Sequence, residues 1–304
     1  MKSSKLMFVV FLGPALLSYL IIYVYPVLRT ALMSFFYVQN ITDNSSEWKF
    51  VKLDNYINLL TDNQLFMQSL KNIGYIYFWG LLGVMFFALL FAVILNSGVR
   101  FKEFFRSVLY LPNIVAAVAM GTMWVQYVFN SQYGLLRSIF NFFGLTGLAE
   151  FAWTDDTHLL LSMTIAYSFG CIGYFMLIYM AAMDKVPSDY YEAATIEGAG
   201  IFNKFFRITL PLIRNVFRTT LVLWSTGCIG FFAWSLMFSN INWNIRTVTP
   251  MVYMYNIVFQ DAIGMDPSQK NAGAGAAVGM ILTILAVAVF TIINFVVKED
   301  DVEY

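Results

Sequence analysis

The residues best placed to act on another molecule lie in one polar stretch, residues 187–212, which interrupts the hydrophobic second half of the chain. Ser188 is the expected N-cap of a short helix, and Glu192 places negative charge near its start. Gly198 and Gly200 follow, and both are able to supply the positive φ of a tight reversal. The pattern therefore predicts a helix, a turn and a second helix that together present a glutamate for docking.

The second half of this stretch predicts another short helix. Phe202, Phe205 and Phe206 are expected on one face, opposite polar and basic residues. The pair Leu210-Pro211 is expected to end the helix. An amphipathic loop lying on the membrane surface would show a similar pattern, so this alternative stays open at the level of periodicity alone.

Seven residues of this stretch resemble the EAA loop of bacterial ABC importer permeases. In that family the loop forms a cytoplasmic coupling helix that sits in a cleft of the ATPase subunit. Small side chains allow a partner backbone to approach closely, a glutamate offers a salt-bridge partner, and a glycine fixes the bend. The matching residues are Glu192, Ala193, Ala194, Gly198, Ile208, Leu210 and Pro211.

The composition is that of a membrane protein. Of the 304 residues, 60% are hydrophobic, 18% aromatic and 12% charged, whereas globular proteins have about 25% charged residues. The formal net charge is zero, so nothing in the charge balance points to nucleic acid. Cys171 and Cys228 lie inside apolar runs and form no CxxC pair, which makes them small buried side chains in this interpretation.

Long apolar runs predict six transmembrane helices, because a bilayer requires about 20 apolar residues per helix. The predicted spans are approximately residues 6–28, 73–95, 109–129, 159–183, 219–238 and 277–297. Exterior loops are expected at about 36–71, 130–157 and 239–275. Lys and Arg number eleven on one side and seven on the other. This bias places both termini and the 187–212 loop in the cytoplasm.

Two further segments resemble the sugar-permease branch of the same family. Residues 50–60 are similar to its exterior FxGLxNYxxLL element, although Lys52 stands where glycine is usual. Residues 104–107 and Leu111-Pro112 resemble a second element, where the proline permits a kink. The apolar segment 248–259 is too short to span and predicts an interfacial or re-entrant helix. The glycine-rich run 273–279 predicts close helix packing.

The sequence lacks the residues that several activities require. The sequence contains no GxxxxGK[ST] loop, so ATP and magnesium belong to a partner ATPase in this interpretation. His158 is the single histidine, and no cluster has metal-ligand spacing. The six predicted spans contain no charged residue or histidine, which disfavours an ion-coupled carrier. We therefore expect a non-enzymatic subunit without bound cofactor.

The resemblance also places a substrate path on the helices that flank the loop. Tyrosine and tryptophan suit sugars, because a sugar ring presents C–H groups that stack on aromatic faces. Tyr167 and Tyr174 stand seven residues apart, as do Trp224 and Phe231, so each pair shares a helix face. Aromatic pairs at this spacing also arise from helix packing alone. The candidate residues are Tyr167, Cys171 and Tyr174 in the fourth span, and Trp224, Gly227 and Phe231 in the fifth.

These observations predict one all-α transmembrane domain over residues 1–304, similar to the type I fold of ABC importer permeases of the maltose and glycerol-3-phosphate type. The resemblance implies a bacterial inner-membrane location, a second homologous permease, two ATPase subunits, an extracytoplasmic solute-binding protein and a sugar or oligosaccharide substrate moved by alternating access. A permease for another solute, including the amino-acid branch, remains the alternative. An ion-coupled carrier and a membrane-embedded enzyme are two further alternatives.

Overall fold

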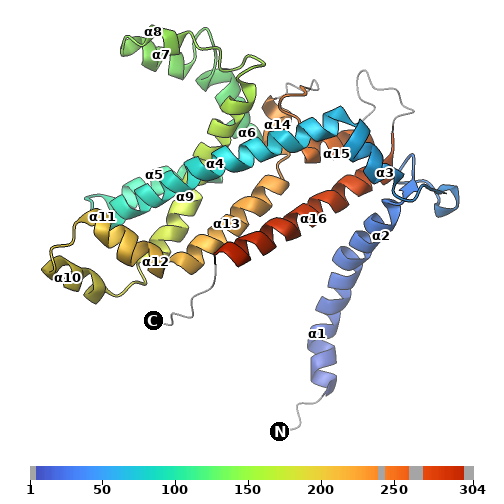
Figure 1. Ribbon diagram of the computed structural model, residues 1–304, viewed down its shortest axis with the longest axis horizontal. Helices are drawn as coiled ribbons and strands as arrows, with labels where there is room; N and C mark the ends of the chain where they lie inside the picture. Colours follow the sequence, from blue (N-terminus) through green and yellow to red (C-terminus); the bar gives the residue numbers. More distant parts are fainter. Residues whose placement is uncertain (1–4, 239–243, 260–269, 298–304) are drawn as a thin grey trace. The chain divides into compact units, whose positions relative to one another are not determined.

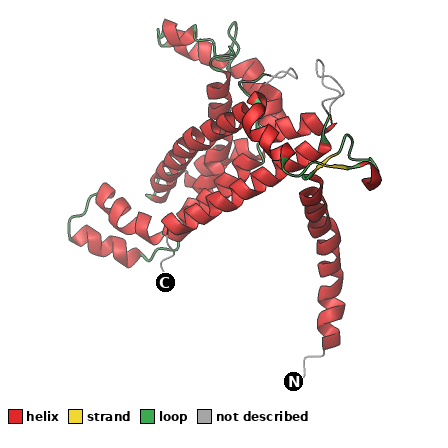
Figure 2. Cartoon of the chain, turned by 45° about the vertical axis from the view of Figure 1, so that its right-hand side comes forward, coloured by secondary structure: helices red, strands yellow, loops and turns green. Residues whose placement is uncertain are grey.

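The computed structural model describes residues 5–238, 244–259 and 270–297, and this part of the chain is almost entirely helical (Figures 1 and 2). The expected all-α class holds apart from one small hairpin, in which β1 (Phe36–Tyr37) pairs antiparallel with β2 (Lys49–Phe50). The chain divides into two compact units, Met1–Met67 with Tyr253–Leu285, and Gln68–Val252 with Ala286–Tyr304. Each unit is described by itself, and the extent of a single domain stays a prediction.

The first unit begins with a long apolar helix and ends with the start of another. Its opening helix runs from α1 (Lys5–Tyr19) through a π-helical turn, η1 (Leu20–Val24), into α2 (Tyr25–Met33). After β1 come η2 (Ser45–Glu47), β2, α3 (Asp54–Ile57) and η3 (Asn58–Asp62). Most of α15 (Pro250–Phe259) and the first half of α16 (Ala272–Val296) complete it.

A buried asparagine holds the hairpin of the first unit in place. The amide of Asn55 donates to the carbonyl oxygens of Ser34 and Phe36, each at 2.9 Å, and the hydroxyl of Tyr56 donates to Ser34 Oγ at 2.7 Å. The segment that resembles the sugar-permease element therefore has a structural role here. Lys52 adopts a φ of 54°, and glycine takes this conformation without steric cost. This conformation accounts for the glycine that the FxGLxNYxxLL element usually has at this position.

The glycine-rich run 273–279 packs closely, as predicted. Within the first unit, the N–H of Ala272 donates to the carbonyl of Val38 at 2.7 Å. A Cβ atom at Gly273 would collide with the carbonyl of Phe36. The backbone of α16 thus approaches the hairpin at a distance that a side chain at this position would prevent.

The second unit contains the remaining helices. In chain order they are α4 (Gln64–Asn96, which starts in the first unit), α5 (Lys102–Ile114), α6 (Ala117–Met123), η4 (Trp124–Val128), α7 (Leu135–Phe142), α8 (Thr146–Ala149), α9 (Leu159–Met183), α10 (Ser188–Ile196), α11 (Ile201–Lys204), η5 (Phe205–Thr209), α12 (Leu210–Leu212), α13 (Arg214–Ile229) and α14 (Ala233–Phe238). Its largest fully buried side chains include Trp224, Tyr179 and Met163.

Four helices of the described residues are long and apolar enough to cross a membrane, and a bent pair would make a fifth. The four are Val10–Met33, Gln64–Asn96, Leu159–Met183 and Ala272–Val296. They match the first, second, fourth and sixth predicted spans. The bent pair, Lys102–Ile114 with Ala117–Val128, turns by 99° where the third straight span was expected. That expectation was wrong in detail, since the helix breaks at residues 115–116 while Pro112 lies inside α5.

The fifth predicted span, residues 219–238, is also interrupted. Helix α13 ends at Ile229, and α14 begins at Ala233. The break is stabilised by side chains that sequence periodicity does not reveal. The hydroxyl of Thr249 donates to the carbonyl of Phe231 at 2.6 Å, and the hydroxyl of Ser235 donates to the carbonyl of Thr247 at 2.6 Å. The first of these bonds pairs a carbonyl that the interrupted helix leaves free.

The predicted interfacial helix in residues 248–259 is present as α15. It begins at Pro250, a residue well suited to the first helical position. Residues 239–243 and 260–269 of the same predicted loop lie outside the described residues.

Candidate functional site

The stretch 187–212 forms a helical lobe at the end of α9 and α13 (Figure 1). Helix α10 covers Ser188–Ile196, and Gly198 follows with a φ of 77°. The N–H groups of Gly198 and Ala199 cap the helix by donating to the carbonyls of Thr195 at 3.0 Å and Ala194 at 2.8 Å. Gly198 is thus the reversal predicted from the sequence, because its left-handed backbone closes α10.

Three details of the predicted lobe were wrong. Pro187, with extended backbone, occupies the N-cap position, and Ser188 is already helical and makes no cap bond. Gly200 has a φ of −70° and supplies no reversal. Helical backbone also continues past Leu210 and Pro211 to Leu212. Pro211 follows the π-helical turn η5, where the N–H of Leu210 donates to the carbonyl of Phe205.

The lobe exposes most of the residues that resemble the coupling motif. Glu192, Ala193, Gly198 and Pro211 are exposed. Ala194, Ile208 and Leu210 are half-buried.

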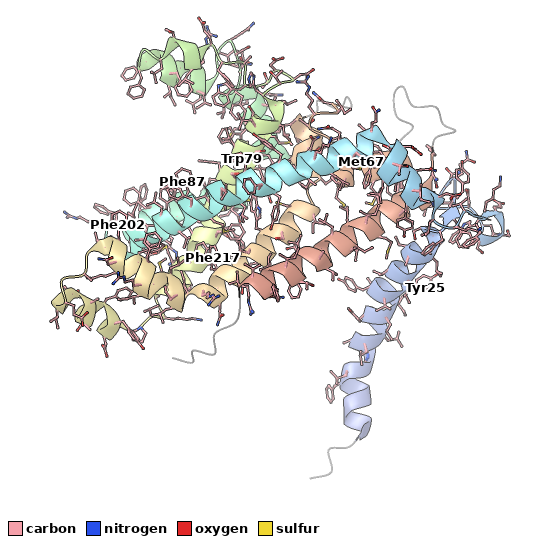
Figure 3. The ribbon with its side chains drawn as sticks, viewed as in Figure 1. Tyr25, Met67, Trp79, Phe87, Phe202 and Phe217 are labelled. Atoms are coloured by element: carbon pink, nitrogen blue, oxygen red, sulfur yellow. The ribbon has the colours of Figure 1, made fainter. Side chains whose placement is uncertain are left out.

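Large apolar side chains are exposed on the same lobe. Ile196 is 89% exposed, Ile201 74% and Phe202 80% (Figure 3 labels Phe202). Phe206 is exposed and Phe205 is half-buried, so the three phenylalanines of the predicted face are not equally exposed. The π-helical turn η5 (Phe205–Thr209) changes the rotation per residue at this point. Exposed apolar side chains beside an exposed glutamate are typical of a docking surface.

The lobe is closed on its inner side by hydrogen bonds that the sequence did not reveal. The hydroxyls of Tyr191 and Thr209 share a hydrogen bond of 3.0 Å. The ammonium group of Lys204 donates to Thr195 Oγ1 at 2.7 Å, and that hydroxyl donates to the carbonyl of Tyr191 at 2.6 Å. We call the Tyr191–Thr209 and Lys204–Thr195 pairs the clasp. Because Thr209, the last residue of η5, is only 6% exposed, the clasp connects α10 to the buried end of η5, which precedes α12 and α13.

A second polar contact lies where α5 and α9 approach their loops. The ammonium group of Lys102 donates to Asn96 Oδ1 at 3.0 Å and lies 3.9 Å from a carboxylate oxygen of Asp184. At the other end of α5, Asn113 donates to the carbonyl of Gly170 in α9 at 3.4 Å. These contacts connect α4, α5 and the residue at which α9 ends. The sequence pattern did not predict these contacts.

The candidate substrate-path residues gather in part. The ring of Tyr167 lies 5.4 Å from that of Trp224, 4.8 Å from Phe231 and 5.8 Å from Trp234, between ring centroids. The Tyr167 hydroxyl points toward Gly227, where an added Cβ would lie 3.4 Å away. Tyr174 is separate, since it is 36% exposed and packs beside Phe175.

This aromatic cluster is tightly packed in the described structure. Trp224 is 1% exposed and Phe231 is 3% exposed. The indole N–H of Trp224 donates to the carbonyl of Tyr77 at 3.1 Å. Cys171 is half-buried, and Cys228 is buried beside the cluster. The cluster therefore connects α4, α9 and α13, and its place on a substrate path stays a prediction.

A long apolar groove of about 890 Å³ runs between α4, α5 and α9. Trp79 and Phe87 of α4 line it (both labelled in Figure 3), together with Leu109 of α5 and Phe169 of α9. Its walls offer few polar groups, so it suits hydrocarbon rather than a sugar. Among the described residues, no group of three or more His, Cys, Asp or Glu side chains could hold a metal ion.

The fold defines a multi-pass membrane protein with an exposed helical lobe between α9 and α13. Residues 84–299 match the family described as "Binding-protein-dependent transport system inner membrane component", and the chain belongs to this family.

Curated relatives cover nearly the whole chain. The arabinooligosaccharides transport system permease protein AraP of Halalkalibacterium halodurans is 30% identical over 289 residues, which is 93% of this chain and 85% of AraP. The diacetylchitobiose uptake system permease protein NgcF of Streptomyces coelicolor is 26% identical over 84% of this chain and 72% of NgcF. The sn-glycerol-3-phosphate transport system permease protein UgpA of Salmonella typhi is 28% identical over 84% of this chain and 82% of UgpA.

A solved structure shares the fold. A chain of a bacterial ABC transporter involved in the import of the acidic polysaccharide alginate superposes with a TM-score of 0.79 and 18% identity, covering 97% of this chain and 96% of that one. The expected ABC importer permease fold is therefore confirmed.

The clasp yields a test that needs no knowledge of the substrate. Tyr191→Phe removes one hydroxyl and keeps the ring, so α10 should open more often. A hydrogen bond contributes about 1 kcal/mol, and about 1.4 kcal/mol corresponds to a tenfold change. We expect amide hydrogen exchange in residues 191–199 to become severalfold faster. Tyr190→Phe is the matched control, because the Tyr190 ring is 49% exposed on the same helix. Equal exchange in both variants would show that the clasp does not hold the lobe.

Proposed function

We propose that this chain is the permease subunit of an ATP-driven, binding-protein-dependent importer that moves a sugar or oligosaccharide into the cell. The observation that carries the proposal is the lobe of residues 187–212. It exposes Glu192 and three large apolar side chains between α9 and α13, and the clasp ties α10 to α11 and η5. In this proposal the lobe docks into an ATPase subunit, and the ATP and magnesium belong to that partner.

The docking residues of the proposal are those of the coupling motif. Glu192 forms an ion pair with a basic residue of the ATPase, and Ala193 and Ala194 allow its backbone to approach. Ile196, Ile201 and Phe202 supply the apolar area that such an interface buries. Ile208, Leu210 and Pro211 lie at the base of α13 and set the angle at which the lobe leaves the membrane.

The carbohydrate class rests on the relatives. The names of AraP and NgcF specify arabinooligosaccharides and diacetylchitobiose. The structures that share the fold are those of an alginate importer, one of them in complex with a periplasmic protein bound to an alginate pentasaccharide. By analogy with these proteins, we propose that this chain moves a sugar or oligosaccharide, which an extracytoplasmic binding protein delivers.

The proposal includes six membrane crossings with both termini in the cytoplasm of a bacterial cell. The interrupted pairs α5 with α6 and α13 with α14 serve as the third and fifth crossings. At the second of these breaks, the carbonyl of Phe231 is paired within the protein by the hydroxyl of Thr249. A second homologous permease completes the assembly. Its contact area includes the opening helix, in which residues 10–32 contain no buried side chain, because a helix exposed on all sides gains from a partner helix.

The first functional prediction concerns coupling. Glu192→Lys reverses the charge at the docking surface, and Gly198→Val forces a branched side chain into a φ of 77°. Both variants should lose most binding-protein-dependent uptake while membrane abundance stays near normal. Glu197→Lys, an exposed neighbour outside the motif, is the control. Normal uptake by Glu192→Lys and Gly198→Val would contradict the coupling role.

The second prediction concerns the substrate path. Trp224→Ala would remove a buried core ring, at a cost of about 3–5 kcal/mol, so it tests folding rather than binding. Tyr167→Phe removes one hydroxyl and keeps the packing. If this hydroxyl hydrogen-bonds the sugar during passage, the KM of uptake should rise or kcat should fall by about tenfold. ATPase activity stimulated by loaded binding protein should persist. Tyr127→Phe, which alters an exposed tyrosine, should leave uptake unchanged, and an equally normal Tyr167→Phe variant would assign the cluster to packing.

The third prediction concerns orientation. Single cysteines at Ser46 and Asn203, both exposed, are introduced into a chain that carries Cys171→Ser and Cys228→Ala. An impermeant thiol reagent should label position 46 in intact cells or spheroplasts and should reach position 203 only after lysis. Labelling of position 203 in intact cells would reverse the proposed topology.

A further inference from the structure

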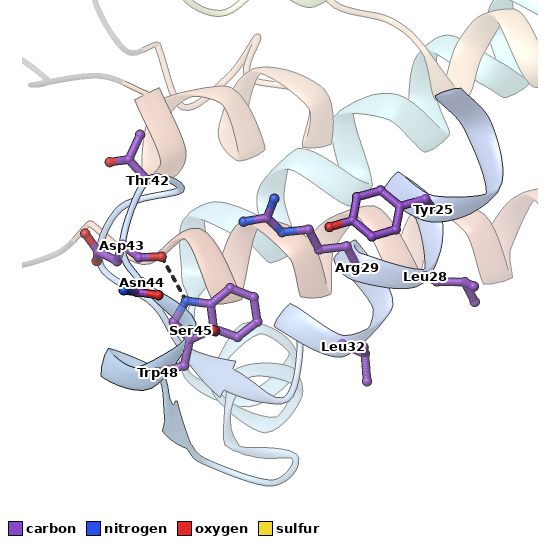
Figure 4. Close-up of a pocket in the computed structure, with 9 residues that line it drawn as sticks. All are labelled: Tyr25, Leu28, Arg29, Leu32, Thr42, Asp43, Asn44, Ser45 and Trp48. Carbon is purple, nitrogen blue, oxygen red and sulfur yellow. Dashed lines mark hydrogen bonds between the residues drawn. The ribbon is translucent and has the colours of Figure 1, made fainter. Parts of the chain in front are cut away.

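A polar pocket of about 620 Å³ lies where α2 meets the loop that follows β1 (Figure 4). Helix α2 contributes Tyr25, Leu28, Arg29 and Leu32, and the loop contributes residues 42–45 and Trp48. All of these residues belong to the first unit. The pocket is far from the 187–212 lobe in the sequence and has no part in the proposed coupling.

The pocket contains a cation without a carboxylate partner. Among the described residues, Arg29 forms no ion pair. Its guanidinium centre lies 6.0 Å from the centre of the Trp48 ring. Asp43 also lines the pocket, but its carboxylate accepts hydrogen bonds from the backbone N–H of Asn40 at 2.7 Å and the Asn40 amide at 3.3 Å. In Figure 4 this carboxylate points away from Arg29. The guanidinium group of Arg29 is therefore left to pair with an anion in the pocket.

The cation lies inside an apolar span. Arg29 is part of the window Val10–Met33, one helical turn before its end. The four helix residues of the pocket stand at spacings of three, four and seven, so they form one stripe along α2. Leu28 is 58% exposed and Leu32 is 61% exposed. A charged arginine in such a place is costly unless an anion pairs with it or its head reaches the membrane interface.

The ligand chemistry follows from this combination. A guanidinium group binds phosphate oxygens with two parallel hydrogen bonds. The indole N–H of Trp48 is directed to the carbonyl of Asp43 at 3.4 Å, so its ring stands as a wall of the pocket rather than as a donor to the ligand. Tryptophan is enriched at the depth of lipid headgroups. Phosphate for the arginine and hydrocarbon for the exposed leucines are supplied together by a phospholipid.

We propose that this pocket binds the phosphate group of a membrane phospholipid. The guanidinium group of Arg29 pairs with the phosphate oxygens, and the hydroxyls of Tyr25 and Ser45 stand in the pocket wall as further donors. The acyl chains run along Leu28 and Leu32. The bound headgroup neutralises Arg29 and fixes the opening helix at the membrane surface.

The test uses the full-length chain purified in detergent and native mass spectrometry with dioctanoyl phosphatidylglycerol as the probe. Arg29→Gln should reduce the fraction of chain that carries the lipid by about tenfold, because a charge-assisted hydrogen bond is lost. Lys49→Gln is the matched control, since Lys49 is an exposed cation next to Trp48 that does not line the pocket. It should bind the lipid as the unmodified chain does.

A second variant and two further probes separate the possible sources of binding. Ser45→Glu places a carboxylate on the exposed rim and should weaken lipid binding without altering α2, so the test survives if Arg29→Gln folds poorly. Dioctanoylglycerol, which lacks the phosphate, should bind weakly, and inorganic phosphate should not displace the lipid at equal concentration. Equal lipid binding by Arg29→Gln and the unmodified chain would overturn the proposal. Equal binding of dioctanoylglycerol, or displacement by inorganic phosphate, would overturn it as well.

Discussion

The fold depends on hydrogen bonds that pair polar side chains lying among apolar ones. Asn72 is 1% exposed, and its amide donates to the carbonyls of Ile245 at 3.0 Å and Val248 at 2.9 Å. This one side chain therefore holds the segment after α14 against α4. The hydroxyls of Tyr179 and Thr220, 2.7 Å apart, connect α9 and α13 in the same way. In surroundings without water, an unpaired group of this kind would cost more than most packing contacts contribute.

Composition was sufficient to predict the long straight helices, and insufficient where a helix breaks. Span lengths follow from hydrophobicity, which is why Gln64–Asn96 and Leu159–Met183 were placed correctly. The breaks at residues 115–116 and after Ile229 depend on partners far away in the sequence. Thr249, eighteen residues after Phe231 in the sequence, donates a hydrogen bond to the carbonyl of Phe231. Apolar periodicity does not indicate such a contact. The sequence therefore predicted a continuous span, and this prediction was wrong.

The candidate site was predictable in its exposed half and not in its buried half. Glu192 and Gly198 stand in a recognisable register, and the positive φ of Gly198 is the feature that only glycine adopts freely. The clasp uses Tyr191, Thr195, Lys204 and Thr209, which are ordinary polar residues in an amphipathic stretch. Their pairing depends on how far the chain folds back after α10. The π-helical turn sets that distance, and no single residue type marks a π-helical turn in a sequence.

The position of the clasp has a mechanical consequence for any partner that binds the lobe. Without it, α10 would be joined to α13 through the turn at Gly198 and the segment α11–η5, and a push on α10 would be absorbed by bending there. With Tyr191 bonded to Thr209, the last residue of η5, the push bypasses the turn and reaches the buried end of η5, which α12 joins to α13. Helix α13 in turn packs Trp224 against Tyr167 and donates to Tyr77 in α4. A displacement of α10 is thus passed to α4 and α9 through side chains that are almost fully buried, where close packing allows rigid-body movement more readily than local deformation.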